Sequence, residues 1–276
     1  MPENQCVNCG TITTALNNWH AICPNCRLYA SSLGADGGTG IDGLEDLRKS
    51  NFDILLSQLE ATRPLAGLTL LEVGCSKGLF LEAALSRGMK TTGIEPEIAM
   101  ADQARAKGLE VFDGFFPDAM PAGATYDIIV FNDVFEHLPD PTAALVACQN
   151  HVRRNGSLLI NLPSSDGAFF RISKLFSRLG WSGPYERLWQ KGFPSPHTFY
   201  FNPKNLRELV EKSTGLRLEY QHSLPSVHRK GTRERVRSTY KGLSGEIVTL
   251  GVVCLSFVLP LLPSDISVTH FRSHDT

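Results

Sequence analysis

The chain has 276 residues, of which 42% are hydrophobic and 20% are charged, and its formal net charge is −1. This length suits one large domain, or one domain with an appendage, and the composition is typical of a soluble globular protein with a full core. A net charge close to zero excludes an overall attraction to nucleic acid, so nucleic acid is not an expected partner. Seven cysteines, an odd count, and no secretory signal predict reduced thiols and a cytoplasmic location.

The N-terminal region contains two Cys-x-x-Cys pairs, at 6–9 and 23–26. Each pair presents two thiolates from one tight turn, and two such turns form the tetrahedral sulfur site that Zn²⁺ prefers. The predicted zinc ligands are Cys6, Cys9, Cys23 and Cys26. Arg27 is the only lysine or arginine in the first 47 positions. This favours a structural metal site, which stabilises a small region, over a nucleic-acid-binding module, which would need more positive charge. We expect a zinc-binding knob over 1–33 and a glycine-rich linker over 34–43.

From residue 69 onward, short apolar runs alternate with helical patterns. This alternation predicts βαβ units and therefore an α/β fold, with a mostly parallel sheet covered by helices on both faces. The expected strands are 70–73, 91–94, 109–112, 126–131, 157–162, 216–220 and 266–271. The expected helices are 44–59, 79–87, 98–107, 141–153 and 206–214.

Residues 71–78 are predicted to form a strand, a glycine turn and the start of a helix. Gly74 and a second glycine four residues later allow a tight turn and a close approach of backbone to ligand. Glu95, at the end of the next strand, is placed to hydrogen-bond two ribose hydroxyls. Ser76 stands where a dinucleotide fingerprint needs its middle glycine, and Glu72 suits an aminium group better than a pyrophosphate. The pattern therefore predicts S-adenosylmethionine as the ligand.

Four blocks in this order resemble the motifs of class I S-adenosylmethionine-dependent methyltransferases: 71–78, 93–96, 131–141 and 154–160. The resemblance runs from about residue 44 to 220 and implies a Rossmann-like, seven-stranded domain over 44–276 with methyltransferase activity. The cofactor-binding residues that follow are Glu72, Gly74, Cys75, Gly78, Glu95, Pro96, Asp113, Asn132 and Asp133. In many relatives an acid follows the glycine after the third strand, whereas here Asp113 precedes Gly114.

Methylation of a hydroxyl requires a proton acceptor, and His137 and His197 are the candidates. Neither an Asn-Pro-Pro-aromatic motif after the fourth strand nor a Pro-Cys nucleophile is present. The arrangement resembles small-molecule and glycan O-methyltransferases of bacterial surface-polysaccharide and quinone pathways, which implies a small-molecule, glycan or lipid-linked acceptor. Two alternatives stay open: an RNA methyltransferase that docks through the knob, and a non-catalytic module that binds S-adenosylmethionine.

An uncharged apolar run at 247–262 follows a cluster of six basic residues and one acidic residue at 229–241. The run is too short to span a bilayer and is interrupted by Pro260. The last strand should pair antiparallel with 216–220, which makes 245–263 an excursion between two sheet strands. We therefore expect peripheral binding of 229–262 to the anionic inner face of the membrane. The alternative is that the run packs on the protein's own core or across a homodimer contact.

Overall fold

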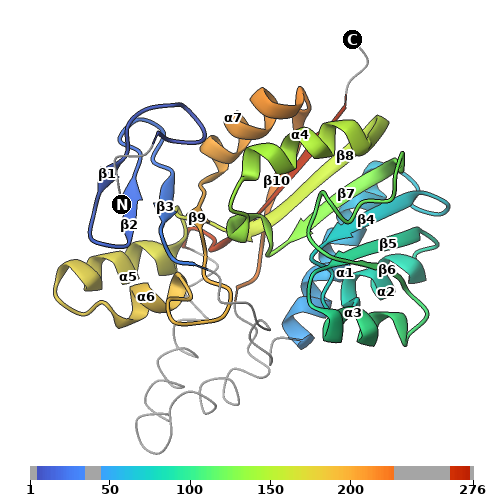
Figure 1. Cartoon of the computed structure of the whole chain (residues 1–276), viewed down its shortest axis with the longest axis horizontal. Helices are drawn as coiled ribbons and strands as arrows, with labels where there is room; N and C mark the ends of the chain where they lie inside the picture. The colour runs from blue at the N-terminus through green and yellow to red at the C-terminus, as the bar shows by residue number, and fades with distance from the viewer. Residues whose placement is uncertain (1–4, 35–44, 227–261, 274–276) are drawn as a thin grey trace, which may run out of the picture.

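The computed structural model describes residues 5–34, 45–226 and 262–273, and its centre is a seven-stranded sheet (Figure 1). The strand order is β10-β11-β8-β7-β4-β5-β6, in which β11 runs antiparallel to both neighbours and the other pairings are parallel. The strands are β4 (Thr69–Val73), β5 (Lys90–Glu95), β6 (Glu110–Asp113), β7 (Tyr126–Asn132), β8 (Val152–Pro163), β10 (Arg217–Leu224) and β11 (Ile266–Arg272). This topology confirms the predicted Rossmann-like sheet, including the antiparallel last strand.

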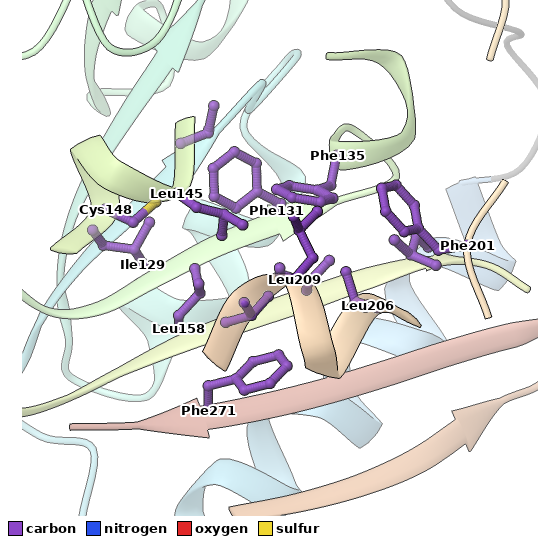
Figure 2. Packing of buried hydrophobic residues seen from close by; sticks show 14 of the residues in the cluster. Ile129, Phe131, Phe135, Leu145, Cys148, Leu158, Phe201, Leu206, Leu209 and Phe271 are labelled. Atoms are coloured by element: carbon purple, nitrogen blue, oxygen red, sulfur yellow. The ribbon is translucent and has the colours of Figure 1, made fainter. Parts of the chain in front are cut away.

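Helices cover both faces of this sheet, as Figure 1 shows. On one face lie α4 (Pro141–His151) and α7 (Pro203–Thr214), and on the other lie α1 (Glu45–Thr62), α2 (Leu79–Ser86) and α3 (Ile98–Arg105). Because side chains alternate along a strand, β4 supplies Leu71 and Val73 to one core and Leu70 to the other. Figure 2 shows the first core, where Phe131 and Phe271 from the sheet meet Leu206 from α7.

Two helices that the sequence did not predict follow the fifth strand of the sheet. They are α5 (Ala168–Arg178) and α6 (Gly183–Leu188). Both pack with aromatic residues of the N-terminal region in a separate cluster that includes Trp19, Tyr185 and Trp189. None of the helices expected from the sequence covers this segment, which lies between the expected strand 157–162 and the expected helix 206–214.

The cysteine-containing region forms a small antiparallel sheet together with a strand from far along the chain. Its order is β1-β2-β3-β9, with β1 (Thr14–Ala15), β2 (His20–Ile22), β3 (Tyr29–Ser31) and β9 (Phe199–Tyr200). The hydroxyl of Ser31 also donates to the carbonyl of His197, at 2.7 Å. The knob therefore shares its sheet with the segment that carries one of the two candidate histidines.

Most of the predicted linker, 35–43, and the apolar run as far as 261 lie outside the described residues. Among the residues that are described, no helix is long and apolar enough to cross a membrane. The domain boundaries at 33 and 43 stay predictions.

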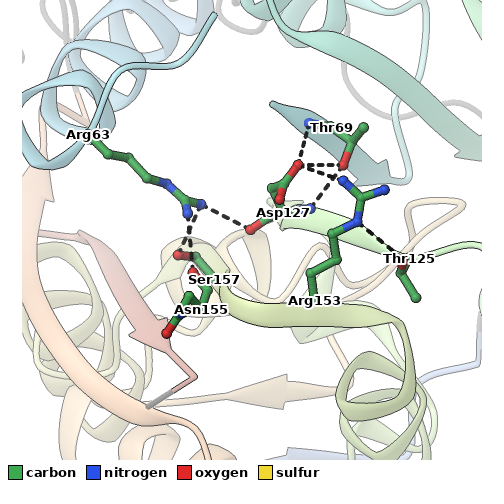
Figure 3. A network of polar contacts seen from close by, with 7 residues as sticks. All are labelled: Arg63, Thr69, Thr125, Asp127, Arg153, Asn155 and Ser157. Atoms are coloured by element: carbon green, nitrogen blue, oxygen red, sulfur yellow. Dashed lines mark hydrogen bonds and ion pairs between the residues drawn. The ribbon is translucent and has the colours of Figure 1, made fainter. Parts of the chain in front are cut away.

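A hydrogen-bonded network connects the residues at the end of the sheet where β4 and β7 begin (Figure 3). The carboxylate of Asp127 accepts from the amide and hydroxyl of Thr69, both at 2.8 Å, and from Arg153 Nη1 at 3.0 Å. Arg63, just beyond α1, donates to the backbone carbonyl of Asp127 at 3.0 Å. Partial burial favours a higher pKa for Asp127, but the hydrogen bonds from Thr69 and the charges of Arg153 and Arg63 outweigh it and hold that pKa below its ordinary value.

Candidate active site

The glycine turn after β4 leaves no room for side chains. Gly74 has φ +70°, and a Cβ added to it would lie 2.6 Å from Val134 Cγ2. Gly78 has φ +77°, and its Cβ would lie 2.3 Å from Leu109 Cδ1. Both glycines are therefore required by backbone conformation and by packing, and the turn carries exposed backbone at the carboxyl end of the sheet, where α/β folds bind ligands.

Glu95, at the end of β5, holds this turn in place. Its Oε2 accepts from the backbone N–H of Ser76 at 2.7 Å, and its Oε1 accepts from the N–H of Glu97 at 2.9 Å. Burial raises the pKa of Glu95, although these two hydrogen bonds oppose the shift. Each carboxylate oxygen has a second lone pair, so the side chain can still accept from two further hydroxyls.

Glu72 and Asn132 form a buried polar pair at the neighbouring strand ends, β4 and β7. Asn132 Nδ2 donates to Glu72 Oε1 at 2.9 Å. Within the described part of the chain, Glu72 Oε2 and Asn132 Oδ1 are buried without a hydrogen-bond partner. Burial raises the pKa of Glu72 to about 8. Buried polar atoms without partners are costly, so they indicate a ligand that supplies the missing donors.

The other predicted cofactor residues differ in their surroundings. The side chain of Cys75 is buried in the core around α2, against Gly93, so only its backbone borders the turn. Pro96 is exposed beside Glu95. The carboxylate of Asp113 is half exposed and pairs with Arg105 at 2.8 Å. Asp133 has φ +53°, and its N–H donates to Asn161 O at 2.9 Å.

Both candidate histidines lie around a buried carboxyl group, that of Glu136 in the 3₁₀ helix η1 (Phe135–His137). The Nε2 atoms of His137 and His197 are each 4.0 Å from Glu136 Oε1, and the two rings meet edge to face with centroids 4.7 Å apart. Burial, together with nearby Asp133, raises the pKa of Glu136 well above its ordinary value. Burial lowers the pKa of both histidines, which are therefore neutral.

Hydrogen bonds place the ring proton on Nδ1 in both histidines, but they leave the two Nε2 atoms in different surroundings. His137 Nδ1 lies 3.0 Å from the carbonyl oxygen of Pro196, which can only accept, so Nδ1 carries the proton and Nε2 has the free lone pair. His197 Nε2 lies 3.0 Å from the amide nitrogen of Gln190, which donates to it. Its Nδ1 is buried and has no partner among the described residues. Sequence reasoning missed Gln190, because nothing in its neighbourhood distinguishes it from a surface glutamine.

The four predicted zinc ligands come together. Cys6 Sγ lies 3.5 Å from Cys26 Sγ, and Cys9 Sγ lies 3.4 Å from Cys23 Sγ. All four sulfur atoms lie within 4.8 Å of one another. With Zn–S bonds of about 2.3 Å, tetrahedral thiolates are spaced by just under 4 Å, so the donor set fits Zn²⁺.

Residues 44–221 match the family described as "Methyltransferase domain". The match covers well over half of the chain, and the chain belongs to this family, within the class I S-adenosylmethionine-dependent methyltransferases whose fold and glycine turn it has. The predicted family membership is thereby confirmed.

Known proteins of the family share parts of this sequence and most of its fold. The ubiquinone biosynthesis O-methyltransferase of Stutzerimonas stutzeri is 32% identical over 104 residues, which are 35% of this chain and 45% of that protein. The protein of the same name from Rhizobium leguminosarum is 32% identical over 107 residues, 37% of this chain and 42% of its own length. The chain thus spans less than half the length of these curated relatives.

Solved structures with the same fold include the cyclopropane synthase MmaA2 of Mycobacterium tuberculosis, with a TM-score of 0.57 and 17% identity, covering 86% of this chain and 87% of that one. The magnesium protoporphyrin IX methyltransferase of Synechocystis PCC 6803 with bound SAH has a TM-score of 0.55 and 14% identity, covering 86% and 90%. At this identity the likeness establishes the fold alone.

Proposed function

We propose that the chain binds S-adenosylmethionine at the ends of β4, β5 and β7 and methylates a hydroxyl oxygen of a small-molecule acceptor. The observation that carries the proposal is the unpaired buried oxygen of Glu72, next to a glycine turn. A carboxyl group in that position suits the aminium of the cofactor, and ionisation of Glu72 on binding would supply the countercharge. Glu95 has the lone pairs for two ribose hydroxyls. The O-methyltransferase names of the relatives support oxygen as the methylated atom.

His137 is the proposed proton acceptor. When bound, the cofactor supplies a methyl group whose C–S bond breaks as the new C–O bond forms, leaving S-adenosylhomocysteine. The hydroxyl proton has to pass to a protein group, and His137 Nε2 has both a free lone pair and a ring fixed through Nδ1. The lone pair of His197 Nε2 is engaged by Gln190, so we assign His197, with Glu136, to positioning the His137 ring.

The reaction is tested by incubating the protein with methyl-labelled S-adenosylmethionine and separate small-molecule, cell-envelope and RNA fractions. Label in a small-molecule or envelope fraction is the expected result. Label confined to RNA, or cofactor binding without turnover on any fraction, contradicts the proposal and favours one of the two alternatives.

Once an acceptor is known, kcat measurements on variants can distinguish the roles of His137 and His197. His137→Ala should lower kcat by about 10²-fold or more while cofactor affinity stays within about twofold. Because only the neutral imidazole accepts a proton, and burial lowers its pKa, wild-type kcat should fall only as the pH drops below about 6.5. The Gln190→Ala variant should show the same fall in kcat at low pH. A larger kcat loss for Gln190→Ala than for His137→Ala would assign proton transfer to His197.

We propose further that the four cysteines hold one structural Zn²⁺. The sulfur spacing supports this, and so do the turns that carry the pairs: the N–H of Gly10 donates to Cys6 O at 2.8 Å, and the N–H of Arg27 donates to Cys23 O at 3.0 Å. A region of this size buries too little apolar surface to fold alone, and the metal would supply the missing stability.

Metal analysis of protein prepared without chelator should find about one zinc per chain. Cys23→Ser should release it and leave the seven-stranded domain folded. Cys148→Ser, which changes a buried cysteine of α4, should retain the metal. Wild-type protein without zinc, or equal zinc in both variants, would contradict the proposal.

The sequence of residues 229–262 supports a more specific proposal about the class of acceptor and the location of the protein. We propose that the acceptor is carried on a lipid and that this basic and apolar segment binds the inner membrane face from the cytoplasm; all but Leu262 lies outside the described residues. Co-sedimentation with anionic vesicles tests this. If the wild-type protein does not co-sediment with vesicles but forms dimers in light scattering, the homodimer alternative is supported.

A further inference from the structure

Helix α5 directs its apolar side chains away from the body of the protein. The residues that it buries are Ala168, Phe170 and Ser173. Ile172, Leu175 and Leu179, in contrast, are 37%, 54% and 75% exposed. An ordinary surface helix buries its apolar stripe and exposes its polar one. In α5 an apolar stripe is exposed together with the basic residues.

The exposed residues form one continuous surface. Ile172, Leu175 and Leu179 are spaced three and four apart, which places them on one side of the helix axis. Just beyond the helix, Trp181 is 61% exposed, and its ring stacks on Phe176 with centroids 5.2 Å apart. Figure 1 shows α5 with α6 at the outer edge of the molecule, away from the seven-stranded sheet. Of the other exposed large apolar residues of the catalytic domain, Leu85, Ile98 and Val146 lie on three separate helices, and Phe115 lies outside the helices.

Three basic residues accompany this surface on the same helix: Arg171, Lys174 and Arg178. The helix contains no acidic residue. Arg171 lies 3.2 Å from Asp166, an exposed ion pair that contributes little, and the amine of Lys174 packs on the ring of Tyr29. The apolar stripe is therefore flanked by positive charge that acidic groups barely neutralise.

We propose that the apolar side of α5, together with Trp181, is a membrane-docking surface that inserts among the headgroups of an anionic bilayer. An amphipathic helix with apolar residues on one side and lysine and arginine on the other is the form in which peripheral proteins bind such surfaces. The positive flank selects anionic lipid over a neutral apolar partner. The site is distinct from segment 229–262 and does not depend on the methylation proposal.

The position of the helix also fits such a role. The N–H of Ala168 donates to Pro263 O at 3.0 Å, and the N–H of Phe169 donates to Asp265 Oδ1 at 2.6 Å. Asp265 immediately precedes β11. The first turn of α5 is thereby tied to the central sheet, so docking through its outer side would orient the whole enzyme on the bilayer.

The test uses vesicles of phosphatidylcholine with phosphatidylglycerol, and of phosphatidylcholine alone. Because Trp19 and Trp189 are buried and Trp181 is exposed, mixed vesicles should shift the tryptophan emission to the blue, and Trp181→Phe should abolish the shift. Leu175→Glu with Leu179→Glu should lower partitioning to mixed vesicles by about tenfold or more. Leu85→Glu, an equally exposed leucine on α2, is the matched control and should bind as wild type.

A second variant distinguishes this surface from the basic segment at 229–241, whose six lysines and arginines are changed to glutamine. A blue shift that persists in that variant, even with weaker partitioning, supports docking through α5. Normal vesicle binding by the Leu175→Glu/Leu179→Glu protein, or emission that mixed vesicles do not change, overturns the proposal. Methylation of a water-soluble acceptor should be unchanged in the α5 variant, so failure of either proposal can be recognised separately.

Discussion

The two ends of the central strands β4 and β7 differ in how the carboxyl groups beside them are paired. At the end where β4 and β7 begin, the carboxylate of Asp127 accepts three hydrogen bonds of 2.8–3.0 Å, and its charge faces Arg153 and Arg63. At the end where these strands finish, Glu72, Asn132 and Glu136 each keep a buried oxygen without a partner among the described residues.

This difference separates residues that stabilise the fold from residues that serve a ligand. Paired charges lower the free energy of the folded chain, whereas desolvated carboxyl groups without partners raise it. A protein retains the second kind where a bound molecule supplies the missing interactions, and stability is given up for function there. Neutralising a carboxyl group at the end where the strands finish should therefore weaken cofactor binding and stabilise the fold. Neutralising Asp127 at the other end should destabilise the fold and leave binding unchanged.

The largest effect should come from Glu95→Ala. It removes the acceptor proposed for the ribose and also the two backbone hydrogen bonds that hold the glycine turn. The loss of one charge-assisted hydrogen bond, about 1.5–3 kcal/mol, lowers affinity for S-adenosylmethionine by about 10- to 160-fold, and the loss of both ribose bonds lowers it further. Asp102→Asn, which changes an exposed carboxylate on α3 that pairs with Arg105, is the control and should change affinity by less than about threefold. If calorimetry gives equal affinities for S-adenosylmethionine in both variants, Glu95 does not bind the cofactor.

Glu72→Gln should weaken binding and at the same time stabilise the ligand-free protein. The pKa of Glu72 is raised from 4.5 to about 8 by burial, so its folded form loses stability as the pH rises from about 4.5 towards 8. Glutamine does not titrate, and the variant should therefore exceed wild type by roughly 1–3 kcal/mol at pH 8 but not at pH 4.5. Denaturant unfolding at the two pH values measures this, with Asp118→Asn as an exposed control. A variant less stable than wild type at pH 8 would show that the carboxylate is paired.

Asp127→Asn should have the reverse dependence on pH. Because the pKa of Asp127 is held below its ordinary value of 3.8, its contribution is present at neutral pH and is lost as the pH falls through the folded-state pKa. We expect a loss of about 1–3 kcal/mol at pH 7 that shrinks below pH 4, with unchanged cofactor affinity. Asp166→Asn, which breaks a single exposed ion pair, should cost less than about 0.5 kcal/mol. Weaker cofactor binding by Asp127→Asn would contradict the separation of the two ends.

Local pattern was sufficient to predict the seven strands of the central sheet, the glycine turn and the roles suggested for Glu72 and Glu95, but not the strands of the small sheet. Each of the predicted features depends on residues close together in the sequence, or on successive strands whose ends meet at one edge of a sheet. The contact of Gln190 with His197 depends on an irregular segment, in which Gln190 itself has φ +53°. The joining of β3 with β9 brings together segments far apart in the chain, and a two-residue strand carries too little pattern to be recognised.

The shared sheet of β3 and β9 also affects the order in which the protein is made. The knob residues are synthesised first, yet Ser31 hydrogen-bonds a residue 166 positions later, and Asn8 hydrogen-bonds Glu208, 200 positions later. At about 5–20 residues per second, roughly 10–40 s of synthesis pass before those partners exist. During that interval the four thiols have only their own turns and the proposed zinc to order them. Metal capture would therefore precede completion of the active site, and a nascent chain that failed to bind zinc would present β9 with no preformed sheet to join.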